Sequence, residues 1–80
     1  MSQPTETRII ELVTEVLRRD KGDVTLASRF VEDLEANSLD VVELACLAEE
    51  EFSVRIPESR IAGIRTVSDV IHVINELKQN

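Results

Sequence analysis

A serine at the start of a predicted helix is the residue of this chain that is best placed for chemistry. Ser38 follows Asn37, which caps helices well, and Asp40 stands three residues after that cap, which gives a pattern similar to a capping box. A hydroxyl in the first helical turn is exposed, and the backbone N–H groups there stabilise a phosphate attached to it. Capping alone would also explain a serine here, so the surrounding sequence must decide between the two interpretations.

Acidic residues surround this serine, and no Lys or Arg occurs between Phe30 and Val54. At about 100° of rotation per residue, one face of the helix carries Asp40, Glu43, Leu47, Glu50 and Glu51. No basic residue four positions away relieves the repulsion, and glutamates at the C-terminal turn oppose the helix dipole. The pattern favours an acidic docking face for basic partners, and Leu47 is expected to add an exposed apolar contact.

Catalytic and metal-binding groups are scarce in this sequence. His72 lies just off the apolar stripe of the last helix and is expected to be solvated, and Cys46 has no basic neighbour in sequence that would activate a thiol. Cys46 is therefore expected to be a small apolar residue at the edge of the helix packing. One Cys and one His cannot form a closed zinc site. The sequence predicts no catalytic residue, no metal and no enzyme activity.

Size and charge narrow the class of protein further. The 80 residues make one domain, near the lower size at which a chain sustains its own core. The net charge of −7 disfavours nucleic acid and anionic membranes as partners. No apolar run approaches the ~20 residues of a membrane span, and the N-terminus lacks the features of a signal peptide. We expect a cytoplasmic protein that inserts into no membrane.

Helical periodicity predicts the elements that position Ser38. The first helix runs from about Gln3 to Arg19, and Gly22 is expected to be its left-handed cap. The second helix runs from Asn37 to Phe52, with a core stripe of Val41, Leu44, Ala45, Ala48 and Phe52. Pro57 to Ala62 forms a short helix, and a last helix follows the cap signature that begins at Thr66.

The segment between the first two helices shows no sustained helical or strand periodicity in its apolar residues. It extends from about Asp23 to Ala36, and we expect Phe30, Val31 and Leu34 to hold it on the core as an ordered crossover. The predicted fold is therefore all-α: a four-helix bundle of three main helices and one short helix, with a long loop between helices one and two.

Four stretches of the chain together point to a family. The run from Phe30 to Leu44 contains Ser38-Leu39-Asp40, and Glu49–Phe52, Ile56-Pro57 and Ile64–Asp69 follow it. These residues resemble the acyl carrier proteins of type II fatty-acid and polyketide systems. The resemblance implies a single acyl-carrier domain over residues 1–80. It also implies that a phosphopantetheinyl transferase attaches 4'-phosphopantetheine to Ser38, and that the arm holds acyl intermediates as thioesters in fatty-acid, lipid or polyketide biosynthesis.

The same resemblance implies roles for further residues. Enzymes that transfer, condense or activate acyl groups would dock their basic patches on a monomeric carrier. The expected partner contacts are Asn37, Leu39, Asp40, Glu43, Leu47 and Glu50. The acyl chain would tuck into a pocket lined by Phe30, Leu44, Ala48, Ile56 and Ile64.

Two residues depart from the pattern of the family. Asn37 stands where the family usually has Asp, so it keeps the helix cap but removes a charge beside Ser38. Glu35 stands where the family usually has Gly, and it should not adopt a positive φ easily. We therefore expect a specialised carrier. An aminoacyl or peptidyl carrier is an alternative, although those usually approach the serine through a Gly-Gly-like pair, and so is an unmodified interaction subunit that keeps the carrier fold.

Overall fold

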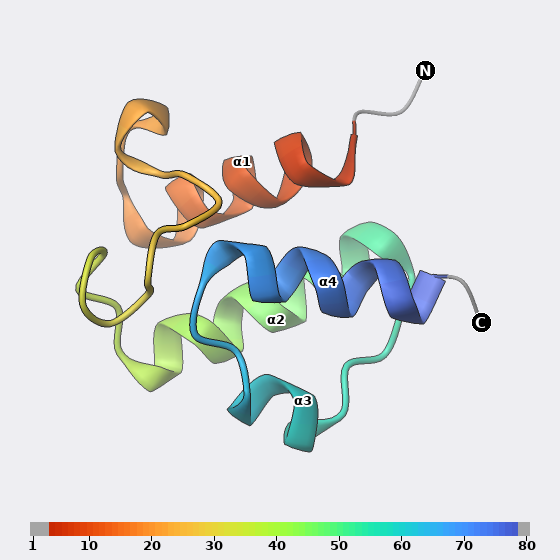
Figure 1. Ribbon diagram of the computed structural model, residues 1–80. Helices are drawn as coiled ribbons and strands as arrows, with labels where there is room; N and C mark the ends of the chain where they lie inside the picture. The colour runs from red at the N-terminus through yellow and green to blue at the C-terminus, as the bar shows by residue number, and fades with distance from the viewer. Residues whose placement is uncertain (1–3, 79–80) are drawn as a thin grey trace.

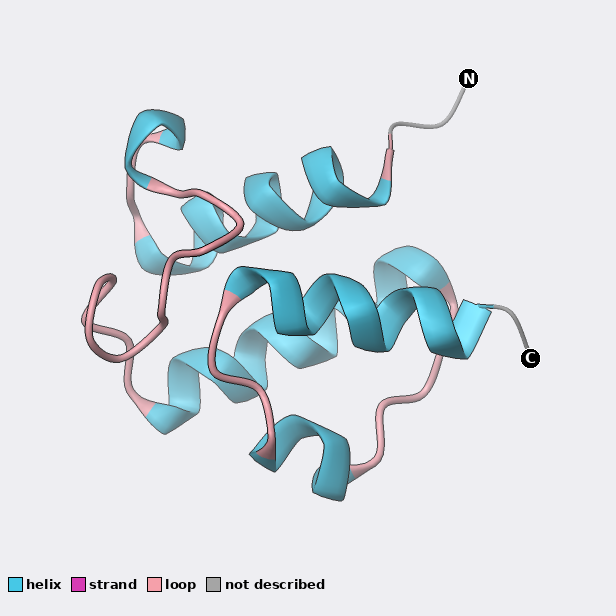
Figure 2. Ribbon diagram, in the orientation of Figure 1, coloured by secondary structure: helices cyan, strands magenta, loops and turns pink. Residues whose placement is uncertain are grey.

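The computed structural model describes residues 4–78 of the chain. The described elements are α1 (Thr5–Leu17), the 3₁₀ helix η1 (Lys21–Asp23), α2 (Ser38–Phe52), α3 (Glu58–Ala62) and α4 (Val67–Lys78). Figure 2 shows helices joined by loops and no strand over this part of the chain. The predicted all-α bundle of three main helices and one short helix is confirmed, and the predicted start of the first helix at Gln3 lies outside the described residues.

The three main helices share one core. In Figure 1, α1 lies beside α2 and α4, and the short α3 lies in the connection between α2 and α4. The three main helices all contact one another. The largest fully buried side chains come from α1, α4 and the crossover that precedes α2: Phe30, Ile9, Ile74, Val13, Val67 and Val70. The contribution of α2 is small in volume, because Leu44, Ala45 and Ala48 are buried while Val41 and Phe52 are only half-buried.

The end of α1 differs from the prediction. The left-handed cap is Arg18, with φ 56° and ψ 45°, and Gly22 lies in η1 instead. The apolar stripe of α1 ends at Leu17, and the polar residues after it would bury nothing by continuing the helix. The chain therefore turns at once, at a backbone cost of about 1–2 kcal/mol for a non-glycine residue.

The crossover, residues 24–37, is ordered by backbone hydrogen bonds to the connection between α3 and α4. The N–H of Phe30 donates to the carbonyl of Arg65 at 2.9 Å, and the N–H of Val67 donates to the carbonyl of Ser28 at 3.1 Å. Phe30 and Leu34 are buried as predicted, but Val31 is 64 % exposed, so its predicted anchoring role is wrong. The side chains of Phe30 and Leu34 already fill the inner side of this turn, and Val31 faces outward.

The start of α4 is held by a reciprocal cap. The Asp69 N–H donates to Thr66 Oγ1 at 3.2 Å, while Asp69 Oδ2 accepts from the N–H groups of Arg65 at 2.9 Å and Thr66 at 3.1 Å. These bonds, above all the one from Arg65, lower the pKa of Asp69 below its ordinary value of 3.8. The ionised carboxylate therefore stabilises the fold.

We predict that Asp69 contributes to the loss of stability in acid. Its contribution is present above its ordinary pKa and is lost as the pH falls through the lower folded-state pKa, because the folded chain then binds a proton less readily than the unfolded one. Urea denaturation across an acid series should show a smaller loss for Asp69→Asn, which should also be about 1 kcal/mol less stable at neutral pH. The exposed Asp20→Asn serves as the control, and equal acid slopes for both variants would contradict the prediction.

Candidate functional site

The first turn of α2 is fixed by a capping box between Asn37 and Asp40. Asn37 Oδ1 accepts from the Asp40 N–H at 2.9 Å, and the Asn37 N–H donates to Asp40 Oδ2 at 3.1 Å. This confirms the predicted cap. Because Asn37 is the capping residue, Ser38 is the first residue of the helix and capping does not explain its hydroxyl.

The surroundings of Ser38 fit an attached phosphate. Its side chain is exposed at the N-terminus of a 15-residue helix. The first N–H groups of a helix have no carbonyl partner within the helix, and the helix dipole is positive at this end. A phosphodiester on the Ser38 oxygen would therefore lie in solvent beside backbone donors.

A groove of about 600 Å³ opens beside Ser38, between α2 and α3. Its lining is mostly apolar and includes Ser38, Val42 and Cys46 from α2, Ile61 and Ala62 from α3, and Ile64. Ser38, Val42 and Cys46 are spaced by four residues, so they lie on one face of α2. A neighbouring groove of about 310 Å³ shares Ala62 and Ile64 with the first, and it reaches Phe30.

The predicted acyl-pocket residues divide into two groups. Ile64 lines both grooves, and Phe30 lines the smaller one. Leu44, Ala48 and Ile56 lie instead in the closed core. Groove residues that were not predicted from the sequence include Val31, Val42, Cys46, Ile61 and Ala62, although the spacing of four from Ser38 was a signal for Val42 and Cys46.

The predicted acidic face of α2 is narrower than the sequence indicated. Glu43 and Glu50 are exposed, and the half-buried Asp40 belongs to the capping box. Leu47 is half-buried and packs against the core, so the expectation of an exposed apolar contact there is wrong. The large apolar side chains exposed on α2 are Leu39 at 76 % and Val42 at 45 %, both close to Ser38 in sequence.

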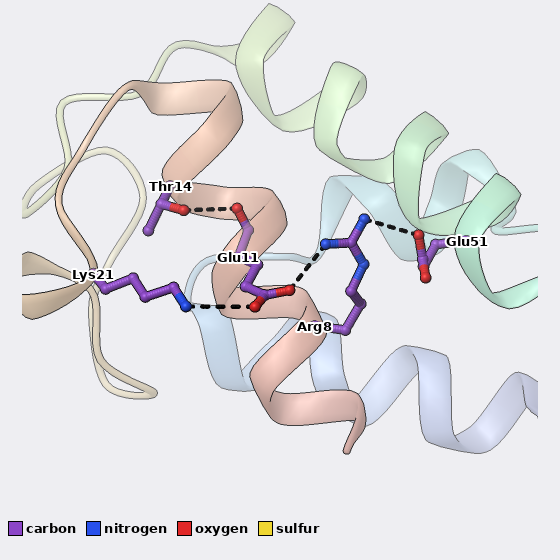
Figure 3. A network of polar contacts seen from close by, with 5 residues as sticks. All are labelled: Arg8, Glu11, Thr14, Lys21 and Glu51. Atoms are coloured by element: carbon purple, nitrogen blue, oxygen red, sulfur yellow. Dashed lines mark hydrogen bonds and ion pairs between the residues drawn. The ribbon is translucent and has the colours of Figure 1, made fainter. Parts of the chain in front are cut away.

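Two of the three C-terminal glutamates have structural partners. Glu51 pairs with Arg8 of α1 at 3.0 Å, and Glu49 Oε2 accepts from the Ile56 N–H at 2.7 Å. Figure 3 shows the Arg8 guanidinium reaching Glu51 and Glu11, and Lys21 also contacts Glu11. The segment around α2 contains no basic residue, as the sequence showed, but Arg8 of α1 pairs with Glu51 from another helix. Repulsion among unpaired carboxylates therefore gives no reason to assign Glu49 and Glu51 to a docking surface.

The other groups considered for chemistry lie apart from one another. His72 is exposed on α4, and Cys46 is exposed on the wall of the groove. Within residues 4–78, no cluster of three metal-ligating side chains occurs. No helix of this part of the chain is long and apolar enough to cross a membrane.

Comparisons with known proteins agree on one family. The family described as "Phosphopantetheine attachment site" matches residues 7–74. The acyl carrier proteins of Rickettsia canadensis and Rickettsia rickettsii are each 49 % identical to this chain over 71 residues, which cover 89 % of this chain and 83 % of theirs. The chain belongs to the acyl carrier protein family. Its members bear phosphopantetheine and are carriers on which transferases and acyl-handling enzymes act, so the chain is not an enzyme.

Solved structures agree with this family. A Mycobacterium tuberculosis protein described as an acyl carrier protein superposes with a TM-score of 0.86 at 30 % identity, over 91 % of this chain and 97 % of that one. The acyl carrier protein of Thermotoga maritima gives a TM-score of 0.79, also at 30 % identity, over 91 % of this chain and 85 % of that one. The family and the cofactor class predicted from the sequence are confirmed.

Glu35 shows why the family usually has glycine at this position. Its φ is 56°, the left-handed region that glycine enters freely and that costs other residues about 1–2 kcal/mol. Glu35 therefore adopts the positive φ at the backbone cost expected for a residue other than glycine, because the path of the crossover into α2 places it in this region.

We predict that the side chain of Asn37 stabilises the fold through the cap alone. Asn37→Ala removes the acceptor for the Asp40 N–H and should lower the free energy of unfolding by about 1 kcal/mol, which lowers the Tm by roughly 4–8 °C in a domain of this size. Asn37→Asp keeps an acceptor and should retain the parental Tm or exceed it, since a carboxylate suits the helix dipole. Thermal unfolding followed by circular dichroism measures both, and equal Tm values for Ala and Asp would refute the assignment.

Proposed function

We propose that Ser38 carries the 4'-phosphopantetheine arm and that the chain delivers acyl groups between enzymes of fatty-acid, lipid or polyketide biosynthesis. The observation that carries the proposal is the exposed hydroxyl of Ser38 in the first turn of α2, where Asn37 already provides the cap. When bound, the arm supplies a thiol that holds an acyl group as a thioester.

Within residues 4–78, the structure shows no hydrogen bond from the Ser38 hydroxyl to a histidine or carboxylate that could act as its general base. The nearby carboxylate of Asp40 accepts the Asn37 N–H and closes the cap. His72, the only histidine, lies on α4. A separate transferase would therefore have to remove the proton of the hydroxyl and transfer the phosphopantetheine. This fits a serine that another enzyme modifies and that does not itself act as a catalytic nucleophile.

Partner enzymes would dock on the surface around the attachment site. Leu39 offers an exposed apolar contact, and the exposed carboxylates of Glu43 and Glu50 lie further along α2. Asp40 adds charge near the helix start, and Asn37 contributes a neutral amide there. Complementary charge accelerates encounter and fixes orientation more than it adds affinity. We therefore expect basic patches on the transferase and on the condensing or acyl-activating enzymes.

The groove beside Ser38 would take the acyl chain. Ser38 lines it, its walls are mostly apolar, with Val42, Ile61, Ala62 and Ile64 among them, and Asn37 and Glu58 add polar groups. Burying a methylene group is worth about 0.8 kcal/mol, so an alkyl chain gains from the apolar part of this surface. The lining therefore favours an acyl carrier over an aminoacyl or peptidyl carrier.

We predict that Ser38→Ala abolishes modification. Incubation with coenzyme A, Mg²⁺ and a broad-specificity phosphopantetheinyl transferase should add one phosphopantetheine to the parent chain and none to the variant, as measured by intact mass spectrometry. Ser59→Ala removes another exposed serine in a helix, on α3, and should be modified like the parent. A full mass increment on Ser38→Ala would assign the arm to another residue and overturn the proposal.

We also predict that the groove shelters medium-length acyl chains. An octanoyl thioester should raise the Tm of the loaded parent by a few degrees more than an acetyl thioester does, because several methylene groups leave water. Ala62→Phe fills the groove and should remove that difference. Ala27→Phe, at an exposed position of the crossover, should keep it. Equal Tm values for the octanoyl and acetyl forms of the parent chain would show that the chain stays in solvent.

A further inference from the structure

The left-handed conformation of Glu35 is unlike the other positive φ values among the described residues. Arg18 and Ser53 also have positive φ, but they end α1 and α2, where a left-handed residue is a common cap. Glu35 ends no helix and stands three residues before Ser38. A non-glycine residue in this conformation persists only where the surrounding contacts determine it.

Buried contacts on both sides of Glu35 leave it little choice of conformation. The side chains of Leu34 and Ala36 are both buried. The Leu34 N–H donates to the Arg29 carbonyl at 3.1 Å, and the Ala36 N–H donates to the Phe30 carbonyl at 2.8 Å. The change in chain direction between these two anchors therefore falls on Glu35.

Among the described residues, Arg19 supplies the one side-chain hydrogen bond that the structure shows to the backbone of Leu34 or Glu35. Arg19 Nη2 donates to the Leu34 carbonyl at 3.0 Å and to Glu35 Oε1 at 3.2 Å. The Glu35 side chain is 81 % exposed, so the ion pair adds little. The Leu34 carbonyl belongs to the same planar peptide as the Glu35 nitrogen, so a bond that fixes this carbonyl also restrains φ of Glu35.

We propose that Arg19 is a positioning residue for the modification of Ser38. It holds the peptide before Glu35, and this sets the path through Ala36 and Asn37 into the first turn of α2. Arg19 comes from the segment just after α1 and acts through the backbone of the crossover. The proposal rests on the proposed function, because it assigns a consequence for the transferase that modifies Ser38.

The expected effect is on recognition by the transferase and less on its chemical step. Without Arg19 the crossover would spend part of its time in other conformations, and the apparent affinity falls with the fraction of competent molecules. Arg19→Ala should therefore raise the KM of the transferase for this chain by about three- to tenfold, the range expected for one net hydrogen bond, with kcat nearly unchanged. Arg19→Lys keeps a donor and should stay near the parental KM.

Glu35→Gly tests whether Arg19 acts through the backbone. Glycine adopts the left-handed conformation without strain, so the double variant Arg19→Ala/Glu35→Gly should recover the parental KM. Arg18→Ala removes the same charge from the adjacent exposed residue and should leave KM unchanged. An unchanged KM for Arg19→Ala overturns the proposal. So does a raised KM that Glu35→Gly fails to rescue, since Arg19 would then contact the transferase directly.

Backbone amide NMR spectra of the unmodified variants separate this inference from the proposed function. Arg19→Ala should shift or broaden the amide signals of residues 34–39, and the double variant should return them to parental values. If the transferase modifies neither the parent nor any variant, the proposed function fails. The spectra would still test whether Arg19 restrains the backbone at Glu35. Unchanged amide signals in Arg19→Ala would overturn the restraint itself.

Discussion

Two hydrogen bonds between Asn37 and Asp40 decide at which residue α2 begins. The buried stripe of Leu44, Ala45 and Ala48 sets which face of α2 packs on the core, and the cap sets where the helix begins. With Asn37 as the cap, Ser38 is the first helical residue and shares a face with Val42, which lines the groove. The same cap leaves the Ser38 hydroxyl out of the capping bonds. The presentation of the serine beside the groove therefore depends on this local interaction.

The features that the sequence predicted well are those with local causes. The bounds of α2 and α3 and the cap signature at Thr66 agreed with the structure to within about a residue, because caps, proline positions and apolar periodicity act within a few residues. The family and its cofactor class also followed from contiguous motifs around Ser38. The aliphatic stripes that face the core could also be predicted from each helix alone, without knowing which helix packs against it.

Several features that the local sequence did not show depend on contacts and packing elsewhere in the chain. The Glu51 carboxylate is paired with Arg8, 43 residues away, and the periodicity of α2 alone could not show this. Leu47 lies on the acidic side of a single-helix projection, yet it packs against the core that α1 and α4 complete. Glu35 adopts a conformation that its residue type disfavours, because buried neighbours fix the chain on either side. In each case, tertiary structure overrode a local preference.

The central claim is that the first turn of α2 presents Ser38 as the attachment point while its cap stays intact. A crystal structure of the chain after loading by a transferase tests this most directly. The account predicts electron density for the arm continuous with Ser38 Oγ, and the bonds between Asn37 and Asp40 preserved. Density on another residue, or a first turn unwound with these bonds broken, would contradict it.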